Sequence, residues 1–215
     1  MPGLGQRVQD AIPLANAALT WIREPRYDTF ITPAAGLGVG VVSFFTVPSG
    51  TIGSGFAVAK SISETNMNTA SQLGTPNQFL IHGFLVQAMV SADGAALNSL
   101  QDFLAIYNTG VFRYITGNNT QLEVPLSIIP AGPGIAGFGS SATGGTPLAQ
   151  AGITNGVPMI SHFYDFRTED GLPTLLGGDQ PFRCELGYAG VAGNLITSAA
   201  CRIKCFLLGI YGKQM

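Results

Sequence analysis

The feature that most constrains this sequence is a stretch of 40 residues without a charged side chain, from Pro125 to Tyr164. A second stretch, from Phe30 to Ala59, contains no charged residue over 30 positions. Only 10% of the chain is charged, compared with about 25% of an average soluble domain. Because a free monomer keeps itself soluble with charged surface residues, we expect much of this surface to be covered by copies of the chain, by another protein or by lipid.

The spacing of glycine, proline and apolar residues favours an all-β fold. The chain has 215 residues, which is enough for one domain with a substantial core. Its 29 glycines and 13 prolines separate short segments rich in aromatic and β-branched residues, a pattern typical of strands joined by turns. We therefore expect a single antiparallel β-sandwich of about eight strands. The expected strands are residues 37–47, 55–73, 78–90, 111–115, 120–128, 158–167, 182–188 and 200–211.

Two of these segments are apolar enough to be largely buried. Residues 78–90 form an almost continuous apolar run, in which Gly83 is expected to mark a β-bulge. The last segment, residues 200–211, alternates at first and then becomes apolar. Strands that are too apolar to face water on two sides belong in a core. We expect core positions at Phe79, Ile81, Phe84, Val86, Phe206 and Leu208.

Two helices are expected besides the strands. Residues 4–22 place apolar side chains on one helical face, which Pro13 interrupts or kinks. This helix packs on its own domain, on a neighbouring subunit or on a membrane surface. Residues 95–107 form a second helical stripe, which Asn108-Thr109-Gly110 is expected to end. These patterns predict an N-terminal helical arm at residues 1–27 and a sandwich domain at residues 28–215 that contains one inserted helix.

Apolar positions in the uncharged stretch and in the N-terminal helix are the candidates for contacts between molecules. A segment of 40 residues without charge is a poor free surface, and ordering its Gly-Ser-Ala-Thr centre costs entropy that a covering neighbour can offset. The apolar face of the N-terminal helix is a second patch of the same kind. The predicted assembly residues are Leu4, Val8, Ile12, Leu19, Ile22, Ile135 and Phe138.

Signatures of catalysis, cofactors and metals are weak. Residues 132–137 match G-x-G-x-x-G, but Pro133 removes a backbone amide and no helical period follows, so no dinucleotide site is expected. His82 and His162 have no ligand partner at metal-binding spacing, which favours structural roles. The acidic residues between Asp165 and Asp179 leave a calcium site open, with irregular spacing. We predict no enzymatic activity, no cofactor and no small-molecule substrate.

Charge, cysteine content and hydropathy limit the environment of the chain. The net charge is −2, and the few basic residues near the C-terminus are too sparse to predict direct nucleic-acid binding. Cys184, Cys201 and Cys205 favour buried free thiols and synthesis in a reducing compartment. The N-terminus lacks the pattern of a secretory signal, and residues 34–47 are too short for a membrane-spanning helix.

The middle of the chain and its C-terminal end carry a distinctive series of motifs. Residues 97–132 combine a helix, Asn108-Thr109-Gly110, a hairpin and the sequence PLSIIPAG, and a final apolar strand closes in LGIYG at residues 208–212. This series is similar to small jelly-roll capsid proteins, and the single jelly rolls of membrane-containing icosahedral phages are similar in size. The resemblance implies a jelly roll of eight strands in two sheets that assembles into an icosahedral shell. The resemblance implies no catalytic residue in this sequence.

The leading hypothesis is therefore a structural capsid subunit of a virion, assembled in the host cytoplasm. Its expected partners are copies of itself and other virion proteins, and an internal membrane is a further candidate. Two alternatives stay open: a minor, decoration or tail-associated virion protein, and a lectin-like or cupin-like β-sandwich that binds a ligand. The only tryptophan, Trp21, lies in the N-terminal helical pattern and not among exposed aromatic residues as a lectin site requires.

Overall fold

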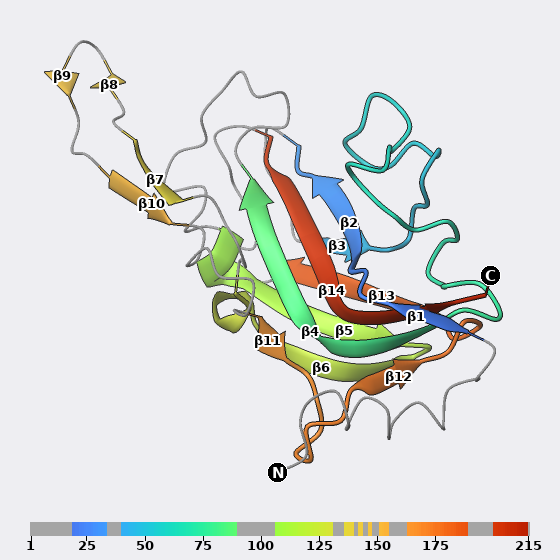
Figure 1. Cartoon of the computed structure of the whole chain (residues 1–215). Coiled ribbons are helices and arrows are strands. Elements are labelled where there is room, and N and C mark those ends of the chain that lie inside the picture. The colour runs from blue at the N-terminus through green and yellow to red at the C-terminus, as the bar shows by residue number, and fades with distance from the viewer. Residues whose placement is uncertain are drawn as a thin grey trace.

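Most strands of the chain belong to two antiparallel sheets that pack face to face (Figure 1). The computed structural model describes residues 19–33, 40–89, 106–130, 136–139, 142–143, 146–147, 151–154, 163–188 and 200–214. The expected all-β fold with antiparallel sheets is confirmed. Because side chains alternate along a strand, successive residues point either between the two sheets or to an outer face.

The first sheet is built around two long strands and is called here the β4–β14 sheet. β14 lies in its centre, with β4 on one side and β1 and β2 on the other. The short strands β11 and β12 pair with the far edge of β4. Its six strands are β1 (Thr20–Ile22), β2 (Arg26–Ile31), β4 (Gln78–Met89), β11 (Tyr164–Asp165), β12 (Thr174–Leu176) and β14 (Arg202–Lys213).

The second sheet has four strands and is called the β5–β13 sheet. In order across the sheet they are β3 (Gly40–Phe44), β13 (Phe182–Tyr188), β5 (Gly110–Thr116) and β6 (Asn119–Pro125). β5 and β6 form the expected hairpin, and Gly117 in its turn has a φ of 57°, which glycine adopts without steric cost. The return strand ends at Pro125, and a 3₁₀ turn (Leu126–Ile128) replaces the expected strand end.

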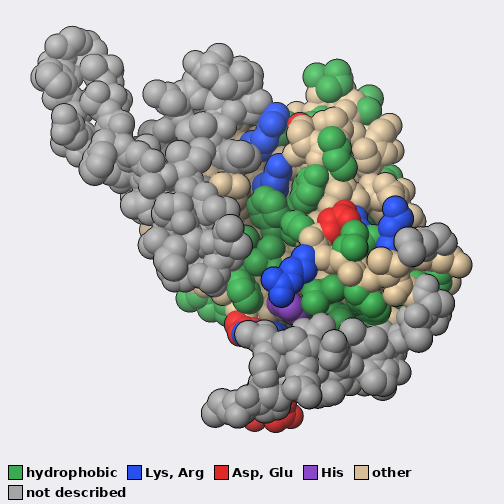
Figure 2. All heavy atoms as spheres, in the orientation of Figure 1, with side chains coloured by type: hydrophobic (Ala, Val, Ile, Leu, Met, Phe, Trp, Pro, Cys, Tyr) green, Lys and Arg blue, Asp and Glu red, His purple; other side chains and the backbone are tan. Residues whose placement is uncertain are grey.

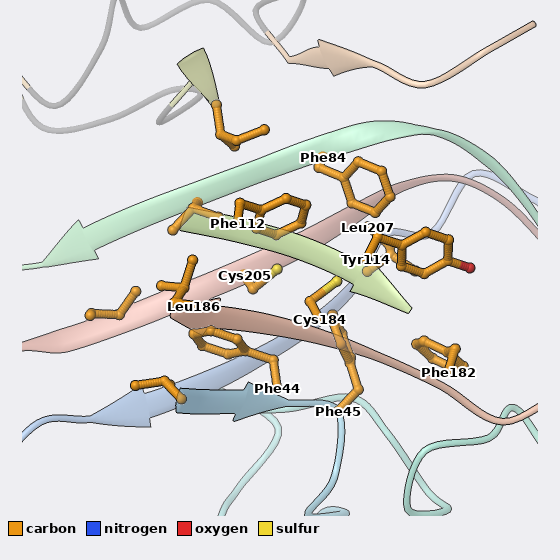
Figure 3. Close-up of a cluster of buried hydrophobic side chains, with 14 of the residues drawn as sticks. Phe44, Phe45, Phe84, Phe112, Tyr114, Phe182, Cys184, Leu186, Cys205 and Leu207 are labelled. Atoms are coloured by element: carbon orange, nitrogen blue, oxygen red, sulfur yellow. The ribbon is translucent and has the colours of Figure 1, made fainter. Parts of the chain in front are cut away.

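The core lies between the two sheets and is rich in aromatic rings (Figure 3). The ring of Phe84 on β4 lies 5.2 Å from that of Phe112 and 5.1 Å from that of Tyr114, both on β5. Cys184 and Cys205 point toward each other from the two sheets. All three cysteines are free and buried, as expected. Burial raises the pKa of the Cys184 thiol, so this residue packs as a neutral side chain.

The predicted core is correct on β4 and partly wrong on β14. Phe79, Ile81, Phe84 and Val86 are buried as expected. Phe206 and Leu208 are only partly buried, because β14 directs the odd-numbered residues Ile203, Cys205 and Leu207 between the sheets. A continuous apolar sequence does not reveal whether its odd-numbered or its even-numbered residues point into the core. A shift of one residue in the register exchanges the two faces of a strand.

β4 contains the β-bulge that Gly83 predicted. Gly83 lies opposite Leu208 and Ile81 opposite Gly209, so His82 is the extra residue. The bulge explains why the residues of β4 in the core cluster are odd-numbered before it, Phe79 and Ile81, and even-numbered after it, such as Phe84 and Val86. A β-carbon at Gly83 would lie 2.1 Å from the carbonyl oxygen of Tyr164. Only glycine therefore lets β11 approach β4 at this point.

The predicted N-terminal helix does not extend to Ile22. Thr20–Ile22 form β1 and pair with Tyr211, Gly212 and Lys213 of β14, because β-branched and aromatic residues fit a pleated surface. The described part of the predicted arm, residues 19–27, thus joins the β4–β14 sheet. Residues 4–18 and residues 95–105 of the predicted inserted helix lie outside the described residues. Residues 106–109 are helical, and the helix ends at Gly110 as expected.

Four short strands in the long uncharged stretch form pairs of their own. β7 (Ala136–Gly139) pairs with β10 (Ala151–Thr154), and β8 (Ala142–Thr143) pairs with β9 (Thr146–Pro147). Within the described residues, none of these strands pairs with either sandwich sheet. In Figure 1 they extend away from the sandwich, at the upper left of the view. We call β7 and β10 together the β7–β10 ribbon.

Candidate assembly surface

A long connection between β3 and β4 carries the strongest candidate surface for contacts between molecules. Residues 45–77, all described, form turns with only two isolated bridges, between Ile52 and Ala59 and between Thr69 and Gln72. The predicted strand at residues 55–73 is therefore wrong, since glycines and side-chain hydrogen bonds to the backbone favour turns. Connections of this length inside a domain are usually functional. We call this segment the β3–β4 loop.

A buried ion pair fastens the base of the β3–β4 loop. Nζ of Lys60 lies 2.7 Å from Oδ1 of Asp28 on β2, and the two side chains are 4% and 1% exposed. Oδ2 of Asp28 accepts a hydrogen bond of 2.7 Å from the backbone N–H of Phe45. Phe45 has a φ of 69°, a conformation that is unfavourable for a bulky residue. The carboxylate thus holds both the loop and the strained turn at its start.

Opposing effects act on the pKa of Asp28, and burial, the largest of them, leaves this pKa above its usual value. Burial raises the pKa of Asp28, whereas the charge and hydrogen bond of Lys60 and the N–H of Phe45 lower it. Attraction in a buried site offsets the desolvation of two charges only when geometry and hydrogen bonding are good. Asp28 meets that condition, because both of its carboxylate oxygens have a donor at 2.7 Å. Removing either charge would leave the other buried without a partner.

A second anchor closes the open edge of β2. The side chain of Asn66 accepts a hydrogen bond of 3.0 Å from the N–H of Tyr27 and donates one of 2.7 Å to the carbonyl of Pro25. Oγ1 of Thr29 donates to the carbonyl of Glu64 at 2.6 Å. Loop residues therefore satisfy backbone groups that an edge strand leaves unpaired. This end of the loop cannot leave β2 without breaking those bonds.

A shallow hollow lies beside this anchor. The guanidinium of Arg26, a residue only 5% exposed, stacks 3.6 Å above the ring centre of Tyr211. Nη1 of Arg26 also donates to the carbonyl of Asn66 at 3.1 Å. The hollow has room for about one water molecule, which is too small for an organic ligand. We therefore regard its lining residues as part of the attachment of the β3–β4 loop. Its lining residues are Arg26, Asn66, Met67, Asn68, Gln72, Leu73 and Tyr211.

The outer end of the β3–β4 loop presents uncharged side chains to solvent. The N–H of Gly50 donates to the carbonyl of Lys60 at 2.8 Å, and the N–H of Lys60 donates to the carbonyl of Thr51 at 2.9 Å. These bonds close the part of the loop from Thr51 to Lys60, while the charged end of Lys60 points inward to Asp28. Figure 2 shows hydrophobic side chains at the upper right, where Figure 1 places this loop. The exposed aliphatic residues, called the apolar tip, are Ile52 (64% exposed), Val58 (71%) and Ile62 (68%).

The apolar tip is held against the body of the sandwich. Gly55 has a φ of 80°, and a β-carbon there would lie 2.4 Å from the carbonyl oxygen of Ile31 at the end of β2. The hydroxyl of Tyr27 donates to the carbonyl of Ile62, which fixes the other side of the tip. An exposed apolar cluster on an ordered support is typical of a docking surface, and a preorganised surface loses little conformational entropy when it binds.

The outer face of the β5–β13 sheet contrasts with the tip. Nη2 of Arg113 lies 2.8 Å from Oε1 of Glu123, and Nε of Arg183 lies 2.6 Å from Oε1 of Glu185. The register also places Glu185 opposite Arg113 across the strands. These charges are paired within the molecule, so this face is compatible with water.

His82 and the acidic residues of the chain do not form a metal site in the described residues. The extra residue of the β-bulge, His82, is half-buried; burial lowers its pKa, and Arg167 and Arg23 lower it further, against a raising effect of Asp165. Asp165 forms an ion pair with Arg167. No group of three or more His, Cys, Asp or Glu residues in the described parts could hold a metal ion. The acidic residues up to Asp179 thus form no such group.

The structure places only part of the predicted assembly residues. Leu19 is buried, and Ile22 is 39% exposed at the end of β1. Phe138 lies in the β7–β10 ribbon, opposite Gly152. The remaining predicted positions, Leu4, Val8, Ile12 and Ile135, lie outside the described residues, as does His162.

The sequence analysis missed the residues of the apolar tip, although it contained a signal for them. The tip begins inside the uncharged stretch from Phe30 to Ala59. The nearest charged residues on either side of this stretch are Asp28 and Lys60, which pair with each other. The ion pair joins the two ends of the stretch, which passes through the buried side chains of β3 and reaches the surface in its last part, where most residues from 49 to 59 are exposed.

Comparisons with protein-family models, with curated proteins and with solved structures give no match to this chain. Among the described residues, no helix is both long and apolar enough to cross a membrane. Function is therefore inferred from the arrangement of strands and surfaces alone.

Proposed function

We propose that this chain is a capsid subunit with a single jelly-roll fold, which assembles with copies of itself into an icosahedral shell. The strand order supports the fold. When β2, β3, β4, β5, β6, the β11–β12 pair, β13 and β14 are numbered one to eight, the sheets follow the orders 1-8-3-6 and 2-7-4-5. The first strand pairs with the last, the second with the seventh, and so on inward, as in one long hairpin rolled upon itself. This order is compatible with a jelly roll of two Greek keys, an architecture used by viral capsids.

The observation that carries the assembly role is the apolar tip on its ordered base. Three aliphatic side chains, Ile52, Val58 and Ile62, are more than 60% exposed on a loop whose two charged residues, Lys60 and Glu64, form ion pairs with Asp28 and Arg202. A free monomer gains nothing from this arrangement, whereas the core of a permanent interface is apolar and depleted in charge. The low charge content of the whole sequence is in keeping with the same role.

The proposed partners follow from this role. Copies of the same chain are the main partner, and other virion proteins and an internal membrane are secondary candidates for the remaining apolar surface. The proposed location is the capsid of a virion assembled in the host cytoplasm. The role is structural and requires no catalytic group.

Electron microscopy and light scattering of the purified protein test the proposal. We expect closed particles, rings or defined capsomers at high protein concentration, because subunits with apolar contact surfaces associate by mass action. A chain that stays monomeric up to its solubility limit, under every salt and pH condition tried, would contradict the assembly role. Defined small rings that never close, even with other virion proteins present, would instead favour a minor virion protein.

A further inference from the structure

We infer that the β7–β10 ribbon of one subunit docks on the apolar tip of the next, so that subunits associate head to tail; this inference rests on the proposed assembly function and names the two halves of one contact. The occupant of the apolar tip is thus a second copy of this chain. The contact joins the two uncharged stretches of the sequence, one from each subunit.

The ribbon requires a partner on physical grounds. β7 and β10 pair in register from Ala136 opposite Thr154 to Gly139 opposite Ala151, and within the described residues they pair with nothing else. A two-stranded ribbon alone is marginally stable in water, and a third surface is needed to stabilise it. The ribbon lies in the 40-residue stretch without charge, so its partner surface is expected to be uncharged too.

The apolar tip is the described surface that matches this requirement. Ile52, Val58 and Ile62 are the three most exposed large hydrophobic residues among those described. By contrast, the charges on the outer face of the β5–β13 sheet already pair with one another. An uncharged ribbon on that face would desolvate those pairs without replacing their contacts. Burial against Ile52 and Val58 of the tip removes apolar area from water.

The positions of the two elements determine the type of contact. In Figure 1 the ribbon lies at the upper left and the β3–β4 loop at the upper right, on opposite sides of the sandwich. A ribbon therefore meets the tip of another molecule and not its own. Two different surfaces that recognise each other make a heterologous contact, which generates rings when the rotation closes. Rings of this kind are the units from which a closed shell is built.

Charge substitution on each half tests the inference in the full chain. The tip variant carries Ile52→Asp and Val58→Asp, and the ribbon variant carries Phe138→Asp. A second ribbon variant replaces residues 136–154 by a short Gly-Ser linker, in case Phe138→Asp alters folding. The control carries Asn118→Asp and Thr120→Asp, which add two charges at exposed positions of the β5–β6 hairpin. Sedimentation and light scattering report association, and thermal melting reports folding.

We expect the tip variant and the ribbon variants each to associate at least about tenfold more weakly than wild type, with unchanged melting temperatures, while the control associates as wild type. The decisive measurement is a 1:1 mixture of tip and ribbon variants. The intact ribbon of one then meets the intact tip of the other, so the mixture should form dimers and nothing larger. Normal association of either variant, or a mixture that stays monomeric, overturns the inference.

The outcomes also separate this inference from the proposed function. Closed wild-type particles whose formation is unaffected by all variants leave the capsid role in place and refute the head-to-tail contact. Wild-type chains or rings that both variants abolish, and that never close into shells, support the contact and refute the capsid role. Flotation of the wild type but not of the tip variant with lipid vesicles, together with normal particle formation by both, assigns the tip to a membrane and overturns the inference.

Discussion

The ammonium group of Lys60 and the carboxylate of Asp28 join two points of the chain that are 32 positions apart, at a distance of 2.7 Å. The pair closes the loop that carries the apolar tip and removes both charges from the surface. A buried pair of this kind stabilises the fold weakly in comparison with apolar packing, but the loss of one partner is severe. The pair therefore fixes where the loop lies more than it strengthens the sandwich.

The first prediction concerns the loss of one charge. Lys60→Met should lower the free energy of unfolding by about 3–5 kcal/mol, because Asp28 then stays buried without the partner that offsets its desolvation. Chemical denaturation at neutral pH measures this change. The double variant Asp28→Asn with Lys60→Met should recover part of the loss.

A surface pair provides the matched control. Arg167 and Asp165 form an ion pair with side chains 25% and 49% exposed, and exposed pairs contribute about 0–1 kcal/mol. Arg167→Met should thus cost much less than Lys60→Met. Equal effects of the two substitutions would show that burial of the Lys60 pair has no special role.

The second prediction uses the two faces of β14. Leu207 is fully buried and Leu208 is only partly buried, so Leu207→Ala should cost about 2–5 kcal/mol and Leu208→Ala clearly less. The two residues are neighbours of the same type, which makes each the control of the other. Urea unfolding of both variants measures the difference, and a larger loss for Leu208→Ala would contradict the assigned parity.

These strands also show what sequence alone can predict. The apolar runs at residues 78–90 and 200–211 place β4 and β14 correctly, because burial of a whole strand leaves a strong compositional signal. Gly83 predicts the bulge, since glycine in a strand marks a close backbone approach. The prediction that Phe206 and Leu208 point into the core is wrong. Which residues of β14 point inward depends on the register of β14 with β4, and local sequence does not contain that register.

The candidate site was less accessible to sequence analysis. The uncharged stretch predicted a covered surface but not which of its residues are exposed. The tip of the β3–β4 loop becomes recognisable only when Lys60 is seen to pair with Asp28, a contact between segments far apart in the chain. The edge of β2 is likewise closed by Asn66 through hydrogen bonds that have no local sequence pattern. Such long-range contacts are determined by tertiary structure.

The third prediction concerns pH. Burial, Arg167 and Arg23 lower the pKa of His82 in the folded protein, with Asp165 opposing them, whereas an unfolded histidine has a pKa of about 6.5. The unfolded chain therefore binds a proton at a higher pH than the folded chain does. His82 therefore contributes its full stabilisation only above the unfolded pKa of about 6.5. This contribution is lost as the pH falls from that value toward the lower pKa of His82 in the folded protein.

Unfolding free energies measured between pH 8 and pH 5 test this dependence, a range chosen around the unfolded pKa of about 6.5. The wild type should lose stability toward the acidic end by more than His82→Gln does. The same series with His162→Gln separates the two histidines of the sequence. Parallel curves for wild type and His82→Gln would refute the lowered pKa.

The last prediction concerns the glycines of the β3–β4 loop. Gly50 and Gly55 both have a φ of 80°, but a β-carbon at Gly50 meets no atom within 4 Å, whereas one at Gly55 would lie 2.4 Å from the carbonyl oxygen of Ile31. Gly50→Ala should therefore cost only the left-handed conformation, about 1–2 kcal/mol. Gly55→Ala carries the same cost and must also push the loop away from β2. We expect a greater loss of unfolding free energy for Gly55→Ala, together with faster proteolytic cleavage within the loop, because the apolar tip loses its support. Similar stability and similar cleavage rates for both variants would show that the tip does not depend on close packing against Ile31.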